Sequence, residues 1–293
     1  MIEITQRHPL FVGEVRGVDL RQPVDSGTLD EIVAAADQYA VLVFPEQAID
    51  DAQQLAFSEL LGPLETTTKA YRPGHKPRLD LHVSDISNLD ASGAVVGETD
   101  RWRLQGLANR LWHTDSSFKP TPAKYSLLSA RAIPPEGGET EFADLRAAYD
   151  ALPAARKKQL EGLVAMHSIM YSRETIGFTD YSDEERAALK AVPQVMVRRH
   201  PGSGRMTLYL ASHAHEIHGM STPDARLLLR DLIEHATQRE FVYTHRWRVG
   251  DLVMWDNRCT MHRAREYDNK YPREMHRTTV GDVAPTLEQV AVA

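Results

Sequence analysis

The sequence predicts a mainly β fold with flanking helices, either a β-sandwich or a jelly roll. The first reason is a series of short segments rich in β-branched, aromatic or alternating residues, at 125–130, 206–211, 240–247, 252–255 and 277–280. The second is that helical patterns fall in the excursions between these segments, not in steady alternation with them. The third is that no GxGxxG or Walker A turn marks a parallel α/β sheet.

The N-terminal segment is expected to mix helix and strand. Asp25-Ser26-Gly27 offers caps for a helix over 28–38, in which apolar residues recur at helical spacing. The sequence YAVLVF at 39–44 is typical of a buried strand. A second helix is expected from its N-cap Asp50 through Leu60, because Gly and Pro follow it.

The next stretch, 64–110, is irregular and polar, and we expect it to form a lid-like insertion because it is too long for an ordinary connection. Further helices are expected at 144–162, 182–190 and 222–238. The last of these has Thr222 as its predicted N-cap, and Gly202-Ser203-Gly204 predicts a hairpin turn. No linker-like composition divides residues 1–293, so we expect a single domain.

The composition limits the kinds of partner. The chain of 293 residues has 34 basic and 41 acidic side chains, a net charge of −7, which argues against a nucleic-acid binder. Its one cysteine excludes an intrachain disulfide and a cysteine-rich metal site. We see no secretory signal at the N-terminus and no apolar stretch long enough to cross a membrane, so we expect a cytoplasmic protein without membrane contact.

Three residues have the pattern of a metal site. His113 and Asp115 are two positions apart, so on a strand both side chains would face the same side. A third ligand is expected from far along the chain, and His262, after the turn that follows the strand LVMW, is the best candidate. Two histidines and one carboxylate form the facial triad of non-heme Fe(II) oxygenases, which leaves coordination positions open. Zinc in the same triad, in a hydrolase, is an alternative.

Two arginines near the C-terminus strengthen the oxygenase interpretation. Arg273 and Arg277 would share one face if the run PREMHRTT is a strand. Buried guanidinium groups need anions, and arginine is suited to bidentate capture of carboxylates. A 2-oxo dicarboxylic acid and a carboxylate substrate would supply such anions.

With these features in place, the chain resembles the taurine/2,4-dichlorophenoxyacetate dioxygenase family, whose members depend on Fe(II) and 2-oxoglutarate. The resemblance extends over nearly the whole chain and is densest in LWHTDSSF, PPEGGETEFADLRAAYDALP, HATQREFVY, VGDLVMWDNRCTMHR and REMHRTT. It implies a double-stranded β-helix (jelly roll) with flanking helices. It also implies Fe(II) as the metal, with 2-oxoglutarate and O₂ as co-substrates.

The resemblance assigns roles to nine residues. His113, Asp115 and His262 match the iron ligands. The positions that match 2-oxoglutarate contacts are Thr140, Trp255 and Arg273. The positions that match substrate contacts are Lys69, Asn88 and Arg277, and His213 is expected to line the same pocket. His200 and the other histidines of HAHEIH are expected to be structural, and Cys259 to be a small buried residue.

The reaction implied is hydroxylation of the carbon next to the carboxylate of an aryloxyacetate, which yields a phenol and glyoxylate with succinate and CO₂. The partner is thus a small anionic aromatic molecule, and homo-oligomers are common in the family. Alternatives are the same chemistry on a sulfonate, an alkyl sulfate or an aryloxypropionate, the zinc hydrolase above, and a non-catalytic ligand-binding jelly roll.

Overall fold

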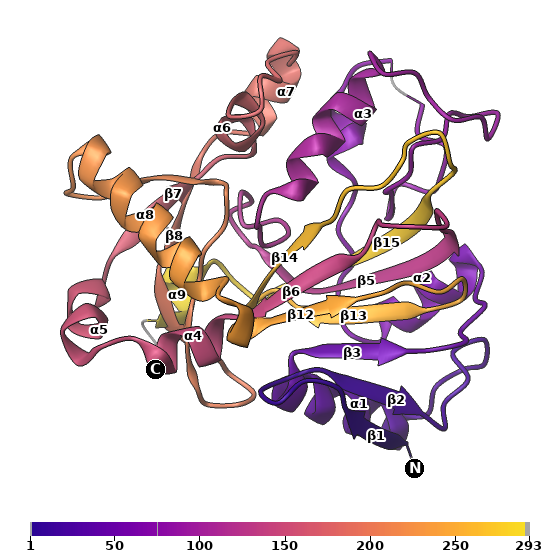
Figure 1. The fold of residues 1–293 in the computed structure, drawn as a ribbon, viewed down its shortest axis with the longest axis horizontal. Coiled ribbons are helices and arrows are strands. Elements are labelled where there is room, and N and C mark those ends of the chain that lie inside the picture. Colours follow the sequence, from indigo (N-terminus) through magenta and orange to yellow (C-terminus); the bar gives the residue numbers. More distant parts are fainter. Residues whose placement is uncertain (1, 75, 291–293) are drawn as a thin grey trace.

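In the computed structural model, which describes residues 2–74 and 76–290, a seven-stranded sheet forms the larger layer (Figure 1). Its order is β1-β2-β3-β13-β5-β15-β4, with neighbours antiparallel except for the parallel pair β2 and β3. The strands are β1 (Glu3–Gln6), β2 (Gly13–Arg16), β3 (Val41–Phe44), β13 (Leu252–Asp256), β5 (Ala123–Ala132), β15 (Glu274–Gly281) and β4 (Val83–Asp85). All the strands expected at 39–44, 125–130, 252–255 and 277–280 belong to this sheet.

The opposing layer is divided into smaller sheets. One has the order β12-β6-β14, another β11-β7-β8, and the hairpin β9-β10 turns at the predicted Gly202-Ser203-Gly204. The strands are β6 (Thr140–Asp144), β7 (Val164–His167), β8 (Val192–Val195), β9 (Val197–Arg199), β10 (Met206–Leu208), β11 (Ala214–Ile217), β12 (Val242–His245) and β14 (Thr260–Ala264). Phe142 of β6 packs with Val253, Trp255 and Met275 of the large sheet, so apolar side chains fill the space between the layers.

Two helices cover the other face of the large sheet, α1 (Ser26–Tyr39) and α2 (Asp51–Glu59). Both predicted caps are confirmed. The Asp25 side chain accepts from the Thr28 backbone N–H at 3.0 Å, and Asp50 forms a capping box with Gln53. The fully buried Leu127 and Leu252 of the sheet pack in the same apolar cluster as these helices.

The helices of the smaller layer differ from prediction at two points. The single helix expected over 144–162 is wrong, because the chain forms α4 (Leu145–Ala151) and α5 (Ala154–Leu160) with an extended Leu152 before Pro153. The helix expected at 222–238 is α8 (Thr222–Ala236), but its N-cap is Ser221, not Thr222. The last helix is α9 (Thr286–Val290). Within the described residues, no helix combines the length and apolar character that crossing a membrane requires.

Residues 64–110, the stretch predicted to form an insertion and called the insertion below, lie at one end of the molecule, beside α6 and α7 (Figure 1). The insertion contains η1 (Thr68–Tyr71), β4, α3 (Arg101–Gly106) and η2 (Leu107–Arg110), and it faces α6 (Ile169–Glu174) and α7 (Asp183–Ala188). Arg101 joins the two parts through an ion pair of 3.0 Å with the buried Glu185 of α7. This end of the fold carries the pocket described below.

Candidate metal centre and substrate pocket

Backbone pairing brings the three predicted metal ligands together. His262 lies on β14, and a bridge joins it to His113, with the N–H of each donating to the carbonyl of the other at 2.8 and 3.0 Å. One side-chain atom from each of His113, Asp115 and His262 lies within 4.8 Å of the others. The expectation that His113 and Asp115 share a regular strand is wrong. Past the bridge the chain turns, and Ser116 adopts a positive φ of 54°.

The hydrogen bonds of these side chains fit a cation between them. Nδ1 of His113 lies 2.8 Å from the Leu111 carbonyl, so it carries the proton and the Nε2 lone pair faces Asp115 Oδ1 at 3.9 Å. Nε2 of His262 lies 3.7 Å from Asp115 Oδ2. Acceptors that face one another across a buried space are satisfied by a metal ion, and two imidazoles with one carboxylate suit Fe(II).

The ionisation states also suit metal binding. Burial lowers the pKa of His113 to about 4 and that of His262 well below its ordinary value, so both rings are neutral near pH 7. Burial opposes the charge of Asp115, but the ion pair with Arg277 and the two imidazoles outweigh it and lower the pKa of Asp115 to about 2. At neutral pH the three side chains therefore offer a metal ion two imidazole lone pairs and one carboxylate anion.

Two polar side chains orient the Asp115 carboxylate. Ser126 donates to Asp115 Oδ2 at 2.8 Å, and Asn257 Nδ2 donates to Ser126 Oγ at 2.9 Å. Asn257 Oδ1 accepts from the Asp115 backbone N–H and from Trp255 Nε1, both at 3.1 Å. The turn between β13 and β14 therefore positions both Asp115 and His262. Sequence reasoning did not single out Asn257 or Ser126, although Asn257 stands in the quoted segment VGDLVMWDNRCTMHR.

The pocket that opens at these three ligands contains all ten residues predicted for the site. They are Lys69, Asn88, His113, Asp115, Thr140, His213, Trp255, His262, Arg273 and Arg277. They come from the insertion, from both layers and from the turn after η2, so only the folded chain assembles them.

One end of the pocket presents a buried guanidinium and a hydroxyl, donors that suit a carboxylate. The guanidinium of Arg273 is buried, and Nη2 donates to the Gly138 carbonyl at 3.2 Å. A Cβ on Gly138 would lie 3.2 Å from Arg273 Nε, and its φ of +74° also favours glycine. Trp247 Nε1 donates to Thr140 Oγ1 at 3.0 Å, which leaves the Thr140 hydroxyl proton free to donate into the pocket.

The predicted substrate contacts are held in different ways. The side-chain amide of Asn88 binds the backbone near Arg273. Its Oδ1 accepts from the Arg273 backbone N–H at 2.8 Å, and its Nδ2 donates to the Tyr271 carbonyl at 3.0 Å. Lys69 Nζ donates to the Asp85 carbonyl at 3.1 Å. His213 lies beside the metal ligands, with its ring centroid 6.0 Å from that of His113. Their contact with substrate stays a prediction.

Comparison with known proteins shows the family of this chain. The family described as "Taurine catabolism dioxygenase TauD, TfdA family" matches residues 3–279. The chain belongs to the TauD/TfdA family. As a member, the protein is a 2-oxoglutarate-dependent oxygenase, and the predicted jelly roll is confirmed.

Several TauD/TfdA members are similar over most of their length. The α-ketoglutarate-dependent 2,4-dichlorophenoxyacetate dioxygenase of Cupriavidus pinatubonensis (strain JMP 134 / LMG 1197) is 47% identical over 279 residues, which cover 94% of this chain and 96% of that one. The (S)-phenoxypropionate/α-ketoglutarate dioxygenase of Sphingobium herbicidovorans is 38% identical and covers 94% and 93%. A crystal structure of AAD-2 in complex with Mn(II) and N-oxalylglycine superposes with a TM-score of 0.90 at 52% identity and covers 98% of each chain.

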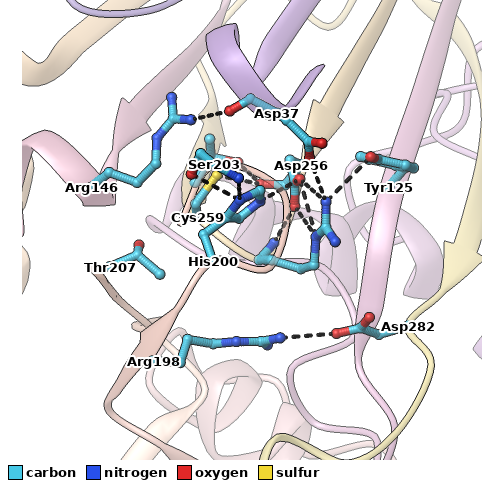
Figure 2. A network of polar contacts seen from close by, with 12 residues as sticks. Asp37, Tyr125, Arg146, Arg198, His200, Ser203, Thr207, Asp256, Cys259 and Asp282 are labelled. Carbon is cyan, nitrogen blue, oxygen red and sulfur yellow. Dashed lines mark hydrogen bonds and ion pairs between the residues drawn. The ribbon is translucent and has the colours of Figure 1, made fainter. Parts of the chain in front are cut away.

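A second buried cluster is formed by His200 together with Asp256 and Cys259, which lie at the turn between β13 and β14 (Figure 2). Its carboxylate is already paired: Asp256 accepts from His200 Nε2 at 2.9 Å and from the Arg258 guanidinium. A metal would have to displace that cation, and burial raises the pKa of the Cys259 thiol. The cluster is therefore a support for the turn, in accord with the structural roles expected for His200 and Cys259.

Proposed function

We propose that the protein is an Fe(II)- and 2-oxoglutarate-dependent dioxygenase that hydroxylates the carbon next to the carboxylate of an aryloxyacetate such as 2,4-dichlorophenoxyacetate. One aryloxyacetate, one 2-oxoglutarate and one O₂ give a phenol, glyoxylate, succinate and CO₂. One oxygen atom enters succinate and the other enters the substrate carbon, and the resulting hemiacetal collapses to the phenol and glyoxylate. The 47% identity to a 2,4-dichlorophenoxyacetate dioxygenase supports this substrate class.

The observation that carries the proposal is that the buried Arg273 guanidinium and the Thr140 hydroxyl line the same pocket as a His-Asp-His triad. Arg273 and Thr140 would hold the distal carboxylate of 2-oxoglutarate, with Trp255 along the wall, as the predicted roles require. In this proposal the 2-oxo acid end of the molecule points toward the triad. A zinc hydrolase would leave the buried guanidinium of Arg273 without a purpose.

The protein's own part in the reaction is to bind and to orient. His113, Asp115 and His262 would hold Fe(II), which when bound supplies the activation of O₂ that is coupled to decarboxylation of 2-oxoglutarate. Arg277, ion-paired with Asp115, is placed to contact anionic groups at the metal. The insertion and α6 enclose the pocket, which limits access of water to the reacting groups.

The test is oxygen uptake and succinate formation with Fe(II) and 2-oxoglutarate across a panel of anions. The panel contains aryloxyacetates, aryloxypropionates, sulfonates and alkyl sulfates, with Asp115→Ala and omission of Fe(II) as controls. We expect stoichiometric phenol and succinate with 2,4-dichlorophenoxyacetate. Turnover restricted to sulfonates or alkyl sulfates would overturn the substrate class, and absence of succinate with every compound would overturn the reaction.

Other expectations stay predictions of the same proposal. They are a cytoplasmic location, homo-oligomer formation, a single domain over residues 1–293 and the absence of nucleic-acid binding. Cell fractionation, sedimentation velocity, limited proteolysis and a DNA-shift assay would test them in turn.

A further inference from the structure

The buried arginines of the described chain divide into two groups. The five are Arg146, Arg173, Arg198, Arg258 and Arg273. Three of them form ion pairs of 3.2 Å or less with buried aspartates, as Arg198 does with Asp282 in Figure 2. Arg173 and Arg273 have no carboxylate within 4.0 Å among residues 2–74 and 76–290, and both line the pocket at the triad. A buried charge without a counter-ion is expensive, so each of these two indicates an anion that is not part of the chain.

Arg173, on α6, has only neutral and distant partners. Nη1 lies 3.4 Å from Ser172 Oγ and from His213 Nε2, and Nη2 lies 3.4 Å from Asn109 Oδ1. Its buried Nε has no hydrogen-bond partner in the described structure. Burial lowers the pKa of Arg173 to about 10, which still leaves the guanidinium charged at neutral pH.

His213 contacts the Arg173 guanidinium as a hydrogen-bond acceptor. Because arginine can only donate, His213 Nε2 accepts from Arg173, and its proton must lie on Nδ1, which donates to Ser117 Oγ at 2.9 Å. The Ser117 hydroxyl then donates to His167 Nδ1 at 3.0 Å. In this tautomer His213 presents no N–H to an anion in the pocket, and its role is to hold the guanidinium.

Apolar side chains accompany this cation. Ile169 precedes Arg173 by four residues on α6, and both line the pocket. The Phe118 ring packs edge-on against His213 with a centroid distance of 5.1 Å. A guanidinium beside an apolar wall suits a molecule with an apolar body and one anionic group.

Most of the other cations that line the pocket have partners or another task. Arg277 is paired with Asp115, Lys69 donates to the Asp85 carbonyl, and Arg273 lies at the Thr140 end. Ion pairs with glutamates hold Lys119, Arg110 and Arg265, and Arg103 is only partly buried. We propose that Arg173 binds the carboxylate of the substrate and that His213 is its positioning residue. The inference rests on the proposed function, because it names the group that recognises the substrate of that reaction. In this proposal His213, which was predicted to line the pocket, acts on the substrate indirectly, through Arg173.

The test compares wild type with Arg173→Gln in initial rates of succinate formation. We expect the KM for 2,4-dichlorophenoxyacetate to rise about 10- to 100-fold, in line with loss of a charge-assisted hydrogen bond, while the KM for 2-oxoglutarate stays within about twofold. The neutral analogue 2,4-dichlorophenoxyethanol reports on the charge. In wild type the KM should be lower for the acid than for the alcohol. The ratio of the two KM values should shrink at least tenfold in Arg173→Gln. Arg230→Gln, on the exposed face of α8, is the matched control and should change none of these values.

Equilibrium binding separates this inference from the proposed function. Calorimetric titration of 2,4-dichlorophenoxyacetate into protein with Mn(II) and 2-oxoglutarate, without O₂, should show a weaker Kd for Arg173→Gln by the same factor. Wild type that binds the acid but forms no succinate would refute the proposed function and leave the inference standing. An unchanged Kd in a folded variant, or a rise confined to the KM for 2-oxoglutarate, would overturn the inference. Arg173→Lys, which keeps the charge, should retain the preference for the acid and covers the case in which the glutamine variant fails to fold.

Discussion

The indole N–H of Trp247 donates to Thr140 Oγ1 at 3.0 Å, and both side chains are buried. This contact fixes the direction of a hydroxyl that would otherwise rotate, because an oxygen that accepts from Trp247 turns its own proton elsewhere. Thr140 was predicted to bind 2-oxoglutarate, whereas Trp247 was treated as part of a strand. In the structure the hydrogen bond from Trp247 orients the Thr140 hydroxyl.

Trp247→Phe should therefore raise the KM for 2-oxoglutarate about three- to tenfold with little change in the KM for the aryl substrate, which corresponds to one hydrogen bond. Steady-state rates of succinate formation measure both constants. In a Thr140→Val background the same substitution should have no further effect, since the bond is already lost. Additive effects of the two changes would contradict the coupling.

Asn257→Ala should weaken metal binding about 10- to 100-fold, because the side chain holds both the Asp115 backbone and Ser126. Anaerobic titration with Fe(II) or Mn(II), followed by tryptophan fluorescence or calorimetry, measures the affinity. Ser126→Ala should cause a smaller loss of metal affinity, because it removes one hydrogen bond to the Asp115 carboxylate. Equal affinity in Asn257→Ala and wild type would show that the turn does not orient the ligand.

Asp256→Asn should lower the free energy of unfolding by about 3 to 5 kcal/mol, because it leaves the buried Arg258 guanidinium uncompensated. Urea unfolding monitored by circular dichroism gives the value. The matched control is Asp150→Asn, which removes the same charge from an exposed ion pair with Arg205 and should cost less than about 1 kcal/mol. Similar losses for both would mean that the cluster in Figure 2 does not stabilise the turn.

Acid should destabilise the protein through His167, whose pKa is lowered to about 3 by burial and by His215. The unfolded imidazole binds a proton near pH 6.5 and the folded one does not until about pH 3, so unfolding takes up a proton between these values. The free energy of unfolding then falls as the pH drops from 6.5 toward 3, by up to about 1.4 kcal/mol per pH unit.

His167→Asn should make the difference in unfolding free energy between pH 7.0 and 5.5 smaller than in wild type, as measured by urea titration at the two pH values. His218→Asn is the control and should keep the wild-type difference, because His218 is exposed although its backbone N–H donates to the Val164 carbonyl of the same strand β7. A pH dependence that is identical in the His167 variant would contradict the assignment.

Much of the site could be predicted from sequence because its members lie in short, specific motifs. Strand pairing then brings His113 and His262 into one bridge, and the ten predicted residues into one pocket. Arg173 escaped prediction for a physical reason. In sequence it stands in an ordinary helical run, and its significance is the lack of a counter-ion, which becomes visible only when the surroundings of every buried arginine are compared.

Errors in the fold prediction are also local in origin. Apolar spacing continues across Pro153, and it masks the break that the ring imposes on the helix. The two-residue spacing of His113 and Asp115 indicated a strand. The chain forms a single β-bridge at His113 and then turns at Ser116. Periodicity reports which side chains are buried, whereas such turns are set by contacts with distant segments.

The strand order of the large sheet has a consequence for synthesis on the ribosome. β5 is flanked by β13 and β15, which are the last two strands of that sheet along the chain to be made. Until residue 281 has left the ribosome, the ten-residue β5 cannot have both of its neighbours, and an open strand edge of that length invites association with other chains. A message truncated before β13 should therefore yield an aggregating product, and nascent chains should need shielding by a chaperone until translation ends.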